Sequence, residues 1–142
     1  FYVHTRAEQY LLRGLKQIHG DAADYNVISN ISDDGYDFSI AARLNDDVRA
    51  RLCDDTILGE RDARRFHEIA LDKQLYAVFR TEPGAFPTEA HIPLRARIFS
   101  QWLPASGYAL ADAPEIQIIH WYPRPHKGER YIEILIPIER PN

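Results

Sequence analysis

The fold of this chain is decided by the stretch Trp102-Leu103-Pro104-Ala105-Ser106-Gly107-Tyr108. Pro104 lacks the amide hydrogen that a helix interior needs. Gly107 can adopt the backbone conformation that a chain reversal requires. The stretch therefore predicts the end of a helix that begins near Ile92 or Pro93, since proline is welcome only in the first turn. The apolar residues that would share one face of this helix, four positions apart, are Leu94, Ile98 and Trp102.

Candidate strands lie on both sides of this helix. The predicted elements, in order, are a helix over 5–19, strands over 25–31, 36–44 and 75–80, the helix that ends at Pro104, and strands over 116–122 and 131–138. This order is that of two βαββ units if a short strand precedes Thr5. We therefore expect one α+β domain over 1–142. Its duplicated βαββ units would form one antiparallel sheet with two helices on one face and a ligand groove. The pseudo-repeats span about 1–44 and 66–139, and a charged linker spans 45–65.

Composition excludes several classes of function. The net charge of −4 argues against a nucleic-acid surface, which is normally basic. The sequence has no apolar run long enough for a membrane helix and no signal-peptide pattern. The single cysteine, Cys53, forms no intrachain disulfide or cysteine-based zinc cluster and fits a cytoplasmic location. The histidines have no metal-ligand spacing, and phosphate loops and nucleophile elbows are missing, so we predict no metal and no cofactor.

Three motifs carry a resemblance to a known family. They are residues 75–80 followed by Gly84, the stretch 102–108, and the strand Tyr-Ile-Glu-Ile-Leu-Ile-Pro-Ile at 131–138. In this order they resemble the GyrI-like (AraC effector-binding) family, the small-molecule-binding domain of multidrug-sensing transcription regulators. The resemblance covers 66–139. It implies a domain that binds hydrophobic compounds, often planar or cationic.

The same resemblance suggests where the ligand would bind. The family has a buried carboxylate among aromatic rings in a Pro-x-x-Glu-x-Tyr strand, but this chain has Gln117 and Ile119 at the matching positions. Glu133 is then the better acidic candidate to replace the missing carboxylate. Glu115 shares a strand face with Gln117 and is the alternative replacement, but we expect it to be exposed at a strand end, because glutamate is rarely buried unpaired. The predicted ligand-binding residues are Phe38, Tyr76, Trp102, Tyr108, Gln117, Trp121, Tyr131 and Glu133.

Alternatives stay open for the aromatic residues and for the function. Trp102 and Tyr108 either pack at the helix corner or line the pocket, and Trp121 either forms a pocket wall or packs at a domain or homodimer interface. The leading hypothesis is an effector-sensing domain that reaches DNA only through a domain outside this chain, or a standalone binding protein. Because the sequence begins at Phe1 and has no methionine, we expect an upstream segment. The other hypotheses are a hydrolase of reactive small molecules, with Glu133 as general base, and a gyrase-inhibitor-like protein-binding module.

Overall fold

The computed structural model describes residues 23–41, 46, 69–122 and 125–141. Its elements are β1 (Ala23–Ser32), β2 (Gly35–Ala41), β3 (Tyr76–Arg80), α4 (Pro87–Arg97), the π-helical turn η1 (Ile98–Trp102), α5 (Leu103–Ser106), β4 (Ala109–Leu110), β5 (Glu115–His120), the 3-10 turn η2 (His126–Glu129) and β6 (Tyr131–Glu139). The helix predicted over 5–19 and nearly all of the linker predicted over 45–65 lie outside the described residues.

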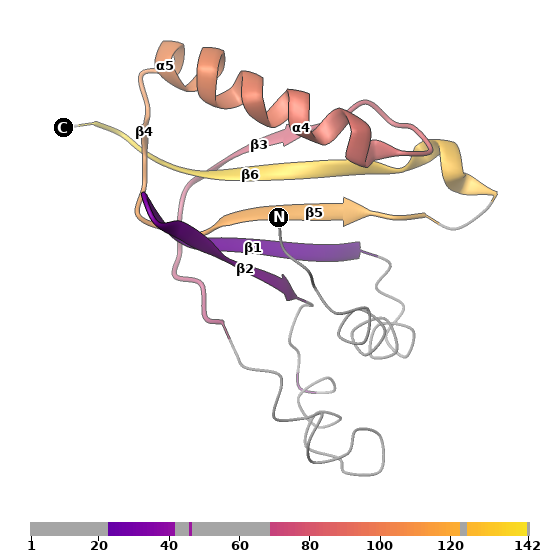
Figure 1. The fold of residues 1–142 in the computed structure, drawn as a ribbon, viewed down its shortest axis with the longest axis horizontal. Coiled ribbons are helices and arrows are strands. Elements are labelled where there is room, and N and C mark those ends of the chain that lie inside the picture. Colours follow the sequence, from indigo (N-terminus) through magenta and orange to yellow (C-terminus); the bar gives the residue numbers. More distant parts are fainter. Residues whose placement is uncertain (1–22, 42–45, 47–68, 123–124, 142) are drawn as a thin grey trace.

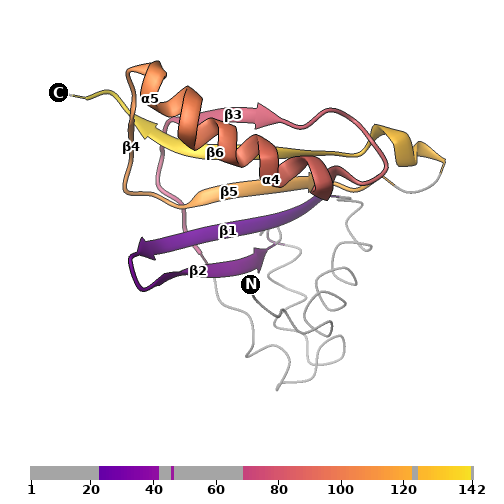
Figure 2. The same cartoon turned by 45° about the horizontal axis from the view of Figure 1, so that its top comes forward.

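The strands form one antiparallel sheet in the order β2-β1-β5-β6-β3, and the short strand β4 pairs with β6. The helical segment from α4 to α5 lies along one face of this sheet (Figures 1 and 2). The predicted α+β class and the single antiparallel sheet are therefore confirmed. None of the helices in the described part of the chain is long and apolar enough to cross a membrane.

The hairpin between β1 and β2 forms where the Asp-Gly turn predicted it. Gly35 has a φ of 143°, a conformation that residues with a β-carbon rarely adopt. The Ser32 hydroxyl accepts a hydrogen bond from the Asp34 amide and thereby supports the turn. A register shift between Ser29 and Ser32 adds a bulge before the turn.

The main helix differs from the prediction at both ends. It begins at Pro87 rather than near Ile92, because Pro87 occupies the first turn, where no amide donor is needed. Pro93 lies inside α4, where it is exposed, so water can reach the carbonyl that loses its donor. The helix also passes Pro104. A π turn precedes this residue, with the Leu103 amide bonded to the Ile98 carbonyl, and the wider turn accommodates the missing amide.

The predicted chain reversal at Gly107 is confirmed. This residue caps α5 in the left-handed conformation, with a φ of 76°. The Ser106 hydroxyl accepts a hydrogen bond from the Tyr108 amide, 3.0 Å away, and so satisfies a donor at the reversal. The chain then enters β4, and this return brings β5 back beneath the helical face.

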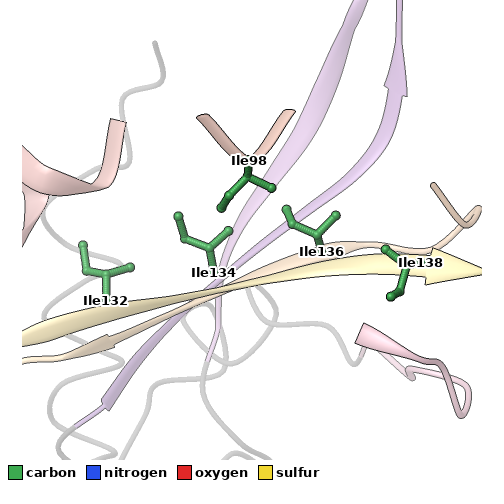
Figure 3. Close-up of a cluster of buried hydrophobic side chains, with 5 residues drawn as sticks. All are labelled: Ile98, Ile132, Ile134, Ile136 and Ile138. Carbon is green, nitrogen blue, oxygen red and sulfur yellow. The ribbon is translucent and has the colours of Figure 1, made fainter. Parts of the chain in front are cut away.

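The core lies between η1 and the central part of β6. Ile98 stands over the isoleucines of β6 (Figure 3), which alternate along the strand and are Ile132, Ile134, Ile136 and Ile138. Ile134 and Ile136 are 0% exposed. Each such side chain contributes about 1.5–3 kcal/mol by burial. Because strand side chains alternate, the remaining β6 residues point to the opposite face of the sheet.

Candidate functional site

Two adjacent inner strands, β1 and β5, place polar side chains on the face that carries α4. Gln117 is paired in register with Ile134 of the core on one side and with Asn26 on the other. Residues directly opposite each other share a face, so Asn26 and Gln117 lie on the α4 face, as does Glu115 two positions earlier. Gln117 is only 5% exposed. We call Asn26, Glu115 and Gln117 the central polar group.

Glu115 is buried, so the expectation that it is an exposed strand-end residue is wrong. Its side chain is 3% exposed, because the first residue of β5 lies beneath α4. Arg95 of α4 compensates the buried charge. Its Nε donates to Oε1 at 2.9 Å and its Nη2 donates to Oε2 at 3.0 Å. A bidentate pair of this kind satisfies both carboxylate oxygens and fixes the guanidinium plane.

The position of Arg95 follows from the periodicity of the helix. His91, Arg95 and Phe99 are four residues apart and form a row beside the central polar group. Leu94, Ile98 and Trp102 form the neighbouring row, which packs on the core. The Arg95 guanidinium also lies over the Phe99 ring, 4.6 Å from its centroid. One helix therefore supplies both an apolar anchor and a charged edge.

The ring of His91, in the same row, has a nitrogen without a partner among the described residues. This nitrogen, Nε2, is buried. Burial lowers the pKa of His91, the nearby Glu115 carboxylate raises it, and Arg95 lowers it again. The ring is therefore held in the neutral form, in which a nitrogen can donate or accept a hydrogen bond.

The α4 face holds four of the predicted ligand-binding residues. Phe38 lies in one row with Ile28 and Glu115, so it shares the face of the central polar group, to which Gln117 itself belongs. Trp102 and Tyr108 lie farther away, against the core. The Trp102 ring meets Phe79 edge-on with centroids 4.9 Å apart and stacks on Tyr108. Their packing at the helix corner is thus observed.

The opposite face holds three other members of the predicted set, Tyr76, Tyr131 and Glu133. Glu133 accepts a hydrogen bond from Arg80 at 3.2 Å, and a second hydrogen bond of 2.5 Å joins its other oxygen to His120 Nε2. Tyr131 stacks on His120, with centroids 4.2 Å apart. Because the sheet separates Glu133 from Gln117, these two residues do not contribute to one binding site.

Burial also raises the pKa of two of these tyrosines. For Tyr131 the effect of burial is reinforced by Tyr122 and by Glu133, and the pKa of Tyr76 is raised by burial alone. Both phenols are therefore protonated at neutral pH. The Tyr76 hydroxyl donates to the Pro114 carbonyl at 2.8 Å, which ties β3 to the start of β5.

Trp121 lies just beyond the end of β5, so we assign it to neither face of the sheet. It is 36% exposed, and the Arg130 guanidinium lies 4.1 Å from the centroid of its ring. Within residues 23–41, 46, 69–122 and 125–141, no three His, Cys, Asp or Glu side chains gather in a group that could hold a metal ion.

Sequence reasoning missed Asn26, His91 and Arg95. A helix starting near Ile92 excludes His91 and hides its four-residue spacing to Arg95 and Phe99. Recognising Pro87 as the first helical residue would have revealed this row, because the spacing is present in the sequence. The pairing of Asn26 with Gln117 follows from strand register, which the sequence does not state.

Comparisons with known proteins agree with this fold. The family model described as GyrI-like small molecule binding domain matches residues 25–139. None of the curated proteins matches the sequence. Among solved structures, the chain is similar to SAV2435 bound to tetraphenylphosphonium, with a TM-score of 0.58 and 16% sequence identity. The match covers 97% of this chain and 83% of that one, and at this identity it shows a shared fold. Because the family model spans most of the chain, including β1 to β6, the chain belongs to the GyrI-like small molecule binding domain family.

Proposed function

We propose that the chain binds a small apolar ligand on the α4 face of β1 and β5, beside the row His91, Arg95 and Phe99. The observation that carries the proposal is the central polar group, in which Glu115 and Gln117 are buried and Asn26 is half-buried on a largely apolar face. Burying polar groups is costly unless they make specific interactions. Small-molecule sites combine apolar walls with a few such groups.

The residues around the central polar group suit an aromatic ligand. Ile28, Phe38 and Phe99 offer apolar or aromatic surface, and the Gln117 amide offers both a donor and an acceptor. His91 adds a buried nitrogen without a partner among the described residues, and a polar atom of the ligand could satisfy it. SAV2435 was solved with tetraphenylphosphonium, which supports a multi-ring ligand for this fold.

We further propose that this domain is the effector-sensing part of a cytoplasmic transcription regulator or a standalone binding protein. Family membership and the net charge of −4 support a sensor that contacts DNA only through another domain. An electrophoretic mobility shift of the complete gene product, with and without a ligand found below, tests the regulator. A ligand that never alters DNA binding would favour the standalone protein.

The test of ligand binding is a thermal-shift screen of planar and multi-ring aromatic compounds, followed by calorimetry of the best ones. A ligand present at 100 times its dissociation constant adds about 2.7 kcal/mol to the free energy of unfolding. Gln117→Leu preserves the size of the side chain but removes its amide. It should therefore change the dissociation constant of the best ligand by about tenfold.

The matched control is Gln101→Leu, since Gln101 is exposed on η1. It should leave the dissociation constant within about twofold of wild type. If a folded protein shows no shift with any compound, the proposal fails. If Gln117→Leu and Gln101→Leu behave alike, the ligand binds somewhere other than the α4 face of β1 and β5.

A further inference from the structure

We infer that Arg95 acts as a built-in cation at Glu115 and restricts the ligand to uncharged or anionic aromatic compounds. This inference rests on the proposed function, because it concerns the same face of β1 and β5. It assigns Arg95 as a specificity-determining residue.

Arg95 already occupies the two groups that a ligand cation would bind, the Glu115 carboxylate and the Phe99 ring. Both oxygens of Glu115 accept hydrogen bonds from the guanidinium, at 2.9 and 3.0 Å. An aromatic ring also attracts cations, and the ring of Phe99, next to Glu115, carries the same guanidinium 4.6 Å from its centroid. A second cation on this face of β5 would therefore find the carboxylate and the Phe99 ring already engaged.

The charges of the central polar group, Arg95 and His91 sum to about zero. Arg95 and Glu115 cancel, Asn26 and Gln117 carry no charge, and burial holds His91 neutral. A ligand cation must either displace Arg95 or remain unpaired, and an unpaired buried charge is strongly unfavourable. An uncharged ligand leaves the pair intact. An anion gains from Arg95, whose side chain is 37% exposed and whose guanidinium has N–H groups beyond the two bonded to Glu115 at 2.9 and 3.0 Å.

The test compares three probes of similar shape: tetraphenylphosphonium, tetraphenylborate and triphenylphosphine oxide. The first two have four phenyl rings and opposite charges, and the third is neutral. Titration calorimetry at constant ionic strength should show that wild type binds the borate and the oxide at least about tenfold more tightly than the phosphonium.

Two variants should move this ratio in opposite directions. Arg95→Gln frees the carboxylate and should tighten phosphonium binding by about tenfold while weakening borate binding. Glu115→Gln frees the guanidinium and should tighten borate binding. The matched control is Arg97→Gln, which removes the same charge from an exposed position of α4. It should leave the affinities for the borate and the oxide, each relative to that for the phosphonium, unchanged.

The outcomes separate the inference from the proposed function. If none of the three probes binds any folded variant, the proposed function fails, and the inference fails with it. If the oxide binds but wild type prefers the phosphonium, or if Arg95→Gln and Arg97→Gln alter the ratio equally, only the inference is overturned. Circular dichroism establishes folding first. If Arg95→Gln does not fold, the ratio of borate to phosphonium affinity is compared between Glu115→Gln and Arg97→Gln. Equal ratios in those two variants would refute the role of Arg95.

Discussion

The pair Arg95–Glu115 offers a sharp energetic test, because its two members are buried to different extents. We consider Arg95→Met, Glu115→Gln and the double variant. The first leaves a carboxylate whose side chain is 3% exposed without its partner, whereas the second leaves a guanidinium on a side chain that is 37% exposed. The exposed partner can turn to water and the buried one cannot. The two single variants should therefore have unequal effects on stability.

The expected magnitudes follow from this difference in burial. Removing one member of a buried pair costs about 3–5 kcal/mol, and the partial exposure of Arg95 places Arg95→Met near 3 kcal/mol, because water screens that side of the carboxylate. Glu115→Gln should cost about 1 kcal/mol, the net value of a typical hydrogen bond. The double variant has no buried charge and should lie within about 1 kcal/mol of wild type.

Urea unfolding followed by tryptophan fluorescence measures these free energies. Equal m-values would show that each variant exposes the same surface on unfolding as wild type does. The double variant should be about 3 kcal/mol more stable than the sum of the single variants predicts, which is the coupling of a contacting pair. The reasoning is refuted if Arg95→Met costs no more than Glu115→Gln. It is equally refuted if the two losses simply add in the double variant.

Three further predictions concern the core, the helix end and pH. Ile134→Ala should lower the free energy of unfolding by about 2–5 kcal/mol, whereas Val78→Ala, at a residue 52% exposed, should lower it by under about 0.5 kcal/mol in the same urea assay. Gly107→Ala should cost about 1 kcal/mol in thermal unfolding, because φ is 76° there, and an equal loss from Gly84→Ala would contradict this explanation. Because burial lowers the pKa of His91 below its unfolded value, the unfolded chain binds the proton first. Stability should fall as pH drops through about 6.5, and His91→Asn should flatten this fall between about pH 7.5 and 5.5. A wild-type profile flat over that window would contradict it.

Much of the fold could be predicted from local chemistry. The β1–β2 hairpin follows from the Asp-Gly turn, and β6 follows from its alternating isoleucines. Gly107 reverses the chain, as predicted, although the helical segment continues past the predicted end at Pro104. The helix start was misplaced because Pro93 was read as a first-turn residue, although the exposed position of this proline lets α4 continue through it.

The candidate site was much less predictable. Gln117 and Glu133 are both mid-strand polar residues in the sequence, but only strand pairing shows that they lie on opposite faces. Glu115 has the sequence features of an exposed strand end, and its burial depends on a helix residue 20 positions away. Contacts of this kind are long-range, and local patterns do not determine them.

Turn chemistry and side-chain periodicity are local properties, and they were enough to predict the described strands other than β4, their antiparallel pairing and the chain reversal at Gly107. Which polar residues lie beside one another depends instead on strand register and on how the helix packs on the sheet. The antiparallel register joins Asn26 to Gln117, and the docking of α4 places Arg95 on Glu115. The physical reason is that a buried charge is stable only beside its partner, and the fold alone brings that partner within hydrogen-bonding distance.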